Sequence, residues 1–286
     1  MKTSDAATEI TRASKSNLAF AFIAMSGARR RDITTFYAFC RVIDDIADDN
    51  LRDPETKRRE LARWRQSLRG EFANEPALAR PVRQLILTYP ITPEMLEEII
   101  TGVEMDVDIR RYATWDELRV YCHRVASAVG LISIEIFGYR NPQCRDYAIA
   151  LGLALQMTNI IRDVATDLKA DRIYLPAQDL ARFHYDEEDL RNHLGDSRFT
   201  QLMNFQAARA EKFFADAARL LPPEDRRSML PAEIMRSIYH ALLRRMKLDN
   251  FRIFEKDYRL SKLEKSGRVT AQFLNCFLNL RRQASV

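Results

Sequence analysis

The 286-residue chain carries 45 Lys and Arg against 40 Asp and Glu, a formal net charge of +5. Glycine is scarce, ten prolines are scattered, and Ala, Leu, Arg and Glu dominate, so the composition predicts an all-α fold. The nearly balanced charge and the lack of a recognition motif argue against a nucleic-acid binder, and four cysteines without a C-x-x-C pair argue against a disulfide framework.

No repeat, low-complexity tract or Gly/Ser linker marks a boundary, so we expect a single domain over residues 1–286. Free thiols and the lack of a secretory signal indicate a cytoplasmic protein. The longest uninterrupted apolar run, 147–155, is shorter than the roughly 18 residues of a membrane span, which predicts a soluble or peripheral protein. Scattered prolines separate roughly ten helical patterns.

The first notable helix lies between residues 33 and 49. Its apolar stripe begins with Ile33, Phe36 and Cys40 at helical spacing, and Asp44 and Asp48 continue that stripe. A solvent-facing carboxylate pair normally lies on the opposite face. We therefore expect Asp44 and Asp48 to point inward.

Two further patterns precede the second acidic helix. Asp106 and Asp108 resemble an ordinary solvated pair, and we expect them on the surface. Thr114 and Glu117 have the spacing of a capping box, in which Thr114 caps a helix that extends to about Phe137 and Glu117 reaches back to the cap. The polar stretch 186–196 predicts a short helix and a loop.

The helix from Tyr147 is apolar nearly all round, yet it carries Gln156, Asn159, Asp163 and Asp167 at steps of three, four and four residues. Such a polar seam in a buried helix needs partners, because each unsatisfied buried group costs on the order of 1 to 3 kcal/mol. We expect this seam to face a cation or another polar group.

Carboxylates four residues apart on a helix lie about 5 to 6 Å apart at Cβ, close enough to share metal ions. Oxygen ligands favour Mg²⁺, with Mn²⁺ as an alternative. Two facing pairs would hold a metal-bound diphosphate, Arg41 and Arg162 would help to neutralise it as a leaving group, and the apolar interior would shelter a carbocation. The sequence therefore predicts ionisation of an allylic diphosphate.

From Ser14 to Lys262 the chain resembles the squalene/phytoene synthase family. Residues 37–48 resemble the first aspartate motif of that family, and residues 156–167 with 172–176 resemble the second. Residues 121–130 are similar to a third segment, whose tyrosine lines the reaction cavity. The N-terminal Ser14 and Ser16 match a phosphate-contacting pair, although Asn17 stands where the family usually has Phe.

The resemblance implies an all-α isoprenoid synthase helical bundle around a central cavity, with three groups of functional residues. Lys256, Arg259 and Lys262 lie where the family has a phosphate-contacting Arg, and we choose Lys256. The implied catalytic residues are Tyr37, Arg41, Tyr121, Gln156, Asn159, Arg162 and Tyr239; the substrate-binding residues are Ser14, Ser16, Arg41, Arg172 and Lys256; and the metal ligands are Asp44, Asp48, Asn159, Asp163 and Asp167.

The implied reaction is a Mg-dependent head-to-head (1'-1) condensation of two prenyl diphosphates. Residues 125–130 and 134–138 are more similar to the bacterial hopanoid-pathway enzymes, which favours two farnesyl diphosphates and presqualene diphosphate, squalene or dehydrosqualene as product. NADPH is needed only for squalene. The alternative is a phytoene synthase that uses two geranylgeranyl diphosphates, and the sequence does not determine the chain length, the stopping point of the reaction or the oligomeric state.

An alternative of another class is a non-catalytic helical assembly scaffold, against which the four motif aspartates argue. A water-insoluble product predicts peripheral contact with the inner face of the membrane.

Overall fold

The computed structural model describes residues 21–22, 25, 27–49 and 51–284, with side chains as far as Cys276. These residues contain no strand, and their one β contact is an isolated bridge between Arg111 and Ile173. The all-α prediction is confirmed. The helices are α3 (Gly27–Asp48), α4 (Pro54–Arg69), α5 (Ala79–Thr88), α6 (Pro93–Asp108), α7 (Trp115–Cys122), a π-helical segment (His123–Ser127), α8 (Ala128–Phe137), α9 (Cys144–Lys169), α10 (Ala177–Arg182), α11 (Glu187–Arg191), α12 (Ser197–Leu220), a 3₁₀ turn (Pro223–Asp225), α13 (Leu230–Leu248) and α14 (Lys262–Ala284).

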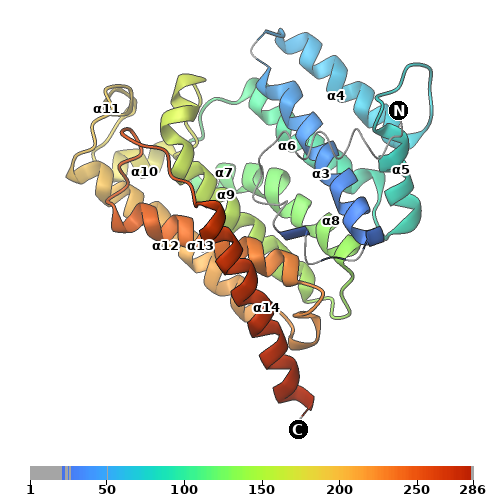
Figure 1. Cartoon of the computed structure of the whole chain (residues 1–286). Coiled ribbons are helices and arrows are strands. Elements are labelled where there is room, and N and C mark those ends of the chain that lie inside the picture. Colours follow the sequence, from blue (N-terminus) through green and yellow to red (C-terminus); the bar gives the residue numbers. More distant parts are fainter. Residues whose placement is uncertain (1–20, 23–24, 26, 50, 285–286) are drawn as a thin grey trace.

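Helix α9 forms the centre of the bundle (Figure 1). It packs against α8 and α12 and also contacts α7 and α13, while α3, α4, α5 and α6 pack against one another beside it. Helix α14 lies along α13, and its C-terminal end extends beyond the other helices. The buried apolar side chains of these helices form one core cluster.

The predicted long helix from Thr114 to Phe137 is present, with two differences in detail. The Thr114 hydroxyl accepts a hydrogen bond from the Glu117 amide at 3.3 Å, as expected of a cap. The Glu117 carboxylate, however, accepts from the Ala113 amide at 2.8 Å and not from that of Thr114. The helix also contains the π-helical segment between α7 and α8. The short helix predicted within 186–196 is α11.

Two glycines allow the π-helical segment to pack closely against its neighbours. A Cβ atom added at Gly152 on α9 would lie 2.6 Å from Cα of Ser127, and one added at Gly102 on α6 would lie 2.6 Å from Cβ of Arg124. Both distances are too short for a side chain. The π-helical turn therefore sits between α6 and α9, and it sets where Tyr121, just before it, and Val125, within it, meet these helices.

Two helical stretches are long and apolar enough to span a membrane by length and composition, namely Trp115–Phe137 and Cys144–Lys169. Their most apolar windows are 44% and 61% buried inside the protein. Mean hydropathy over a window therefore identifies candidate spans, whereas the length of the uninterrupted apolar run predicted none. The burial is typical of helices that supply the core of a bundle.

Candidate active site

The two predicted aspartate motifs line one cavity of about 230 Å³. Asp44 and Asp48 come from the last turns of α3, and Asp163 and Asp167 come from α9. The apolar stripe of α3 and the polar seam of α9 both predicted that these pairs point inward, and both pairs line this cavity. The lining residues are Asp44, Ala47, Asp48, Val103, Asp106, Tyr121, Val125, Gln156, Asn159, Ile160, Arg162, Asp163, Asp167, Arg172 and Tyr174.

The carboxylates of this cavity are crowded. Burial and, to a smaller extent, the charge of Asp163 raise the pKa of Asp167 from 3.8 to about 8, against the opposing effect of Arg172. Burial likewise raises the pKa of Asp44 to about 7, against the opposing effect of Arg41. The Asp44 side chain is 41% exposed to solvent, which screens part of this effect. A cation bound between these groups would relieve the crowding.

Three arginines contact the aspartates. Arg41 approaches Asp44 to 3.8 Å and hydrogen-bonds Asp45 at 2.6 Å. Arg162 donates two hydrogen bonds to the carboxylate of the adjacent Asp163, at 2.7 and 2.5 Å. Since guanidinium groups stay charged at any physiological pH, these side chains keep positive charge beside the cavity.

The third arginine, Arg172, joins the two motifs. It donates to Asp48 at 2.8 Å and to the carbonyl oxygen of Ala47 at 3.4 Å, near the C-terminal end of α3. Its position is fixed by the bridge described above, in which the Ile173 amide donates to the Arg110 carbonyl at 3.0 Å. The segment that follows α9 is thus held against the segment that follows α6.

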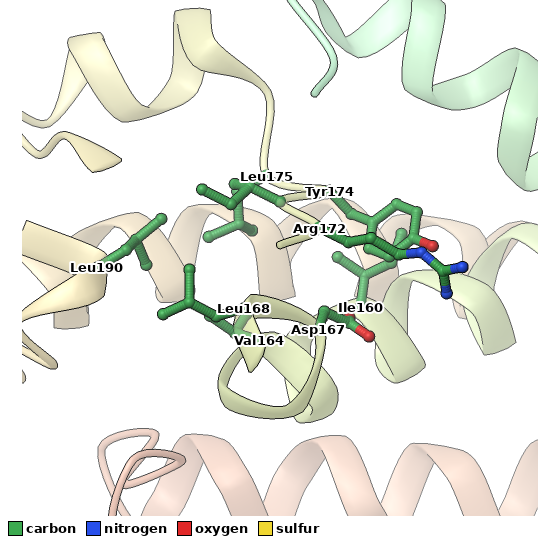
Figure 2. A pocket seen from close by; sticks show the side chains of 9 residues that line it. Ile160, Val164, Asp167, Leu168, Arg172, Tyr174, Leu175 and Leu190 are labelled. Carbon is green, nitrogen blue, oxygen red and sulfur yellow. The ribbon is translucent and has the colours of Figure 1, made fainter. Parts of the chain in front are cut away.

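A small space of about 10 Å³ lies between α9 and this segment. Figure 2 shows the side chains that line it. The apolar side chains of Val164, Leu168 and Leu190 fill one side of it, and the polar ends of Asp167 and Arg172 lie on the other. A space of this size holds about one water molecule. Apolar packing behind Asp167 and Arg172 therefore keeps bulk water away from one side of the charged groups.

The surface position predicted for Asp106 is wrong. Asp106 is 8% exposed and lines the cavity, and its carboxylate accepts hydrogen bonds from Tyr121 at 2.8 Å and from Tyr174 at 2.7 Å. Burial raises its pKa, and the two phenols oppose this rise. Asp108 is exposed as expected and pairs with Arg58. The sequence signal was available, because Asp106 continues the apolar stripe of α6.

Three tyrosines form a wall around Asp106. The rings of Tyr121 and Tyr174 stack with centroids 5.1 Å apart, and Tyr112 lies 5.6 and 6.0 Å from them. Burial raises the pKa of all three phenols, so they are neutral at physiological pH. The buried hydroxyl of Tyr112 has no hydrogen-bond partner in the described structure. The electron-rich rings of Tyr121 and Tyr174 thus line the cavity beside the carboxylates, and Tyr112 packs against both rings.

The residues fit a metal ion that is shared with a ligand. Asn159 donates to Gln156 at 3.3 Å, but its Oδ1 is buried and has no hydrogen-bond partner among the described residues. Within the described part of the chain, no three His, Cys, Asp or Glu side chains cluster closely enough to hold an ion alone. The donors are oxygens of the kind that Mg²⁺ prefers, and phosphate oxygens would complete the coordination.

The remaining predicted site residues lie in several places. Tyr37 packs against the core with its ring 6.3 Å from that of Phe22. Tyr239 of α13 lies close enough to Arg162 to contribute to the raised pKa of that guanidinium, which brings Tyr239 next to the second motif. Ser14 and Ser16 lie outside the described residues.

Lys256 does not line the aspartate cavity. It forms an ion pair with Asp249 and lines a different cavity, so the structure does not bring it to the predicted phosphate site.

The squalene/phytoene synthase family model matches residues 11–265. The chain is 36% identical over 249 residues to a 15-cis-phytoene synthase of Synechocystis sp., which covers 81% of this chain and 73% of that protein. It is 34% identical over 270 residues to the phytoene synthase of Mycobacterium tuberculosis, covering 92% and 87%.

Two solved structures are similar across nearly the whole chain. A dehydrosqualene synthase superposes with a TM-score of 0.84 at 22% identity, covering 96% of each chain, which shows the fold alone. The squalene synthase HpnC from Alicyclobacillus acidocaldarius superposes with a TM-score of 0.74 at 26% identity, covering 87% of this chain and 94% of that one. With the match of the family model, these likenesses show that the chain is a prenyltransferase that belongs to the squalene/phytoene synthase family.

Proposed function

We propose that this cavity binds two prenyl diphosphates and joins them head to head, carbon 1' to carbon 1. The observation that carries the proposal is the single cavity lined by Asp44 and Asp48 of α3 and by Asp163 and Asp167 of α9, with the unpartnered Asn159 oxygen one helical turn before Asp163. Mg²⁺, or Mn²⁺ in its place, would neutralise the diphosphate and make it a better leaving group.

The arginines and tyrosines have distinct roles in this proposal. Arg41 and Arg162 supply positive charge beside the diphosphate, and Tyr239, which lies next to Arg162, helps to orient it. Arg172 leaves Asp48 to meet a phosphate oxygen. The ring of Tyr121 faces the developing carbocation, which an aromatic face stabilises while it also excludes water. Gln156 orients Asn159 through their hydrogen bond.

The named relatives favour geranylgeranyl diphosphate as the substrate and phytoene as the product. Phytoene synthases at 36% and 34% identity cover most of this chain, which reverses the order that the motif segments 125–130 and 134–138 suggested. The second candidate is condensation of two farnesyl diphosphates to presqualene diphosphate, squalene or dehydrosqualene. The 26% identity to a squalene synthase over 87% of the chain supports it. NADPH enters only with squalene as the product.

The test is product identification. Purified protein is incubated with Mg²⁺ and either geranylgeranyl or farnesyl diphosphate, with and without NADPH, and the extracted products are identified by mass spectrometry. EDTA serves as the metal-free control, and Asp163→Asn as the protein control. A C40 hydrocarbon from geranylgeranyl diphosphate supports the first candidate, and a C30 product from farnesyl diphosphate supports the second. No product from either substrate would refute both and restore the non-catalytic scaffold.

We further propose that residues 1–286 form a single domain, which the continuous core supports. The protein is cytoplasmic in this proposal and touches the inner face of the membrane, because the hydrocarbon product is insoluble in water. Limited proteolysis tests the single domain, because a second independent domain would yield a stable fragment.

A further inference from the structure

A second cavity, of about 680 Å³, lies where the end of α13, the following loop and the start of α14 meet. It shares no lining residue with the aspartate cavity. Five basic side chains line it, against two aspartates, and this excess of positive charge sets it apart. The basic residues are Arg244, Arg245, Lys256, Arg259 and Arg268.

Three of these cations have carboxylate partners. Arg245 pairs with Glu264, Lys256 pairs with Asp249, and Arg259 lies 3.2 Å from Asp257. These pairs account for both aspartates of the lining. The positive charge of the cavity therefore comes from the other two arginines.

Arg244 and Arg268 form no ion pair with a carboxylate in the described part of the chain. Arg268 donates to the carbonyl and hydroxyl oxygens of Ser237, both at 3.2 Å, but its Nε is buried without a partner. Burial lowers the pKa of Arg268, and Arg244 and Arg245 lower it further against the opposing effect of Glu264. An anion bound between Arg244 and Arg268 would satisfy both guanidinium groups.

This cavity lies on the opposite face of α13 from the aspartate site. Tyr239 faces Arg162, whereas Ala241, Arg244 and Leu248 line the second cavity, and Leu248 is half a turn away from Tyr239 in helical projection. The anion bound here is thus not the diphosphate held by the aspartate motifs.

Exposed leucines lie beside the basic cavity. Leu248 lines it and is 83% exposed, and Leu263 in the first turn of α14 is also 83% exposed. Leu274, farther along α14, is 58% exposed. Large apolar side chains next to unpaired arginines are typical of protein surfaces that lie on anionic bilayers, where phosphate meets the cations and leucines enter the acyl boundary.

We propose that the cavity between α13 and α14 binds the headgroup phosphate of an anionic membrane lipid, with Arg244 and Arg268 as its ligands and Leu248 and Leu263 inserted beside it. The choice of a lipid rests in part on the proposed function, since an insoluble hydrocarbon product leaves most readily into a bilayer. The phosphate chemistry rests on the arginines alone.

The test is flotation of the full-length protein with vesicles of phosphatidylcholine alone or mixed with phosphatidylglycerol. We expect binding to the mixed vesicles only, and a loss of about 10- to 30-fold in Arg244→Gln/Arg268→Gln. Arg59→Gln/Arg80→Gln on α4 and α5 removes the same charge from exposed arginines without an ion pair and should bind normally. Leu248→Ser/Leu263→Ser should weaken binding and leave its salt dependence unchanged.

The single variant Arg244→Gln is a control for misfolding, because Arg244 is exposed, whereas Arg268 forms hydrogen bonds to Ser237 of α13 that its replacement would remove. Equal losses in Arg244→Gln/Arg268→Gln and Arg59→Gln/Arg80→Gln would overturn the site and leave only a general charge effect. A second result would also overturn the lipid proposal. If Arg244→Gln/Arg268→Gln still binds vesicles normally, but inorganic diphosphate no longer protects its α13 from hydrogen exchange as it protects the unsubstituted protein, the cavity binds a free phosphate. Flotation needs no turnover, so it stands apart from any failure of the proposed condensation.

Discussion

The substitution Asp106→Asn isolates the contribution of a buried carboxylate that the motifs do not contain. Asparagine keeps the shape of the side chain but removes its charge and one of its two acceptor oxygens. Asp106 now accepts from Tyr121 at 2.8 Å and from Tyr174 at 2.7 Å, and the amide can accept from only one of them. The other phenol loses its acceptor and meets an NH₂ group.

The effect on stability follows from that count. Losing one hydrogen bond to a charged acceptor costs about 1.5 to 3 kcal/mol. Removing a buried carboxylate whose pKa is raised offsets part of this cost. We expect a net loss of about 1 kcal/mol, which lowers Tm by about 2 to 4 °C in a protein of this size.

The effect on turnover should be much larger. Tyr121 and Tyr174 line the aspartate cavity, and a displacement of about 1 Å in a group beside the reacting atoms can cost about 10²-fold in rate. We therefore expect kcat to fall about 100-fold while the fold persists.

The matched control is Asp108→Asn, two residues along the same helix, where the side chain is exposed and pairs with Arg58. Initial rates of product formation and thermal melts of both variants are compared with those of the unsubstituted protein. If Asp106→Asn turns over as fast as Asp108→Asn, Asp106 does not position the tyrosines for the reaction.

Three further predictions concern the metal site, a close contact and pH. Asp44→Asn and Asp163→Asn should each lower product formation by at least about 10³-fold with an unchanged circular dichroism spectrum. The control Asp146→Asn, at the exposed start of α9, should form product at the normal rate. Near-normal turnover in either cavity variant would contradict a metal site at these aspartates. Gly152→Ala should destabilise the protein by about 2 to 3 kcal/mol in denaturant melts, because its Cβ would lie 2.6 Å from Cα of Ser127. The control Gly195→Ala, with no atom within 4 Å of its Cβ, should leave the stability unchanged. Equal stability of the two variants would contradict the close packing. Burial raises the pKa of Asp167 to about 8 and that of Asp44 to about 7, so the metal-free folded state binds more protons than the unfolded chain between about pH 4 and about pH 8. The Tm of the metal-free protein should therefore fall as the pH rises through this window and recover when Mg²⁺ and diphosphate are added. A Tm that does not change with pH would show that these carboxylates are not crowded.

Periodicity was sufficient to predict which carboxylates face the cavity on α3 and α9. Asp44 continues a stripe of apolar residues on α3, and such a stripe must face the interior. Asp163 lies on a polar seam of α9, a helix that is otherwise mostly apolar and buried, so this seam also faces the interior. The same criterion applies to α6, where Asp106 follows Ile99 and Val103 at helical spacing, but a pair of aspartates two residues apart was interpreted as a surface feature. The apolar stripe of α6 was present in the local sequence, but the pair of aspartates was given priority over it.

Other features depend on contacts between distant segments. Arg172 reaches Asp48 because the residues after α9 pair with those after α6, and no local pattern around either segment specifies that pairing. The choice of Lys256 as a phosphate ligand stays a prediction, and its ion pair with Asp249 in a different cavity is likewise a contact that no local pattern specifies. The π-helical turn likewise results from the packing of Ser127 against Gly152.

The arginines beside Asp48 and Asp163 have a consequence for how the metal-free protein differs from the loaded one. Each of these aspartates is already matched by an internal counter-ion, Arg172 or Arg162. Metal ions held by these carboxylates would free the same two guanidinium groups to contact an anionic substrate. Binding of metal and of diphosphate would then exchange partners within a fixed set of protein charges, so we expect the two ligands to bind with positive linkage, each strengthening the other.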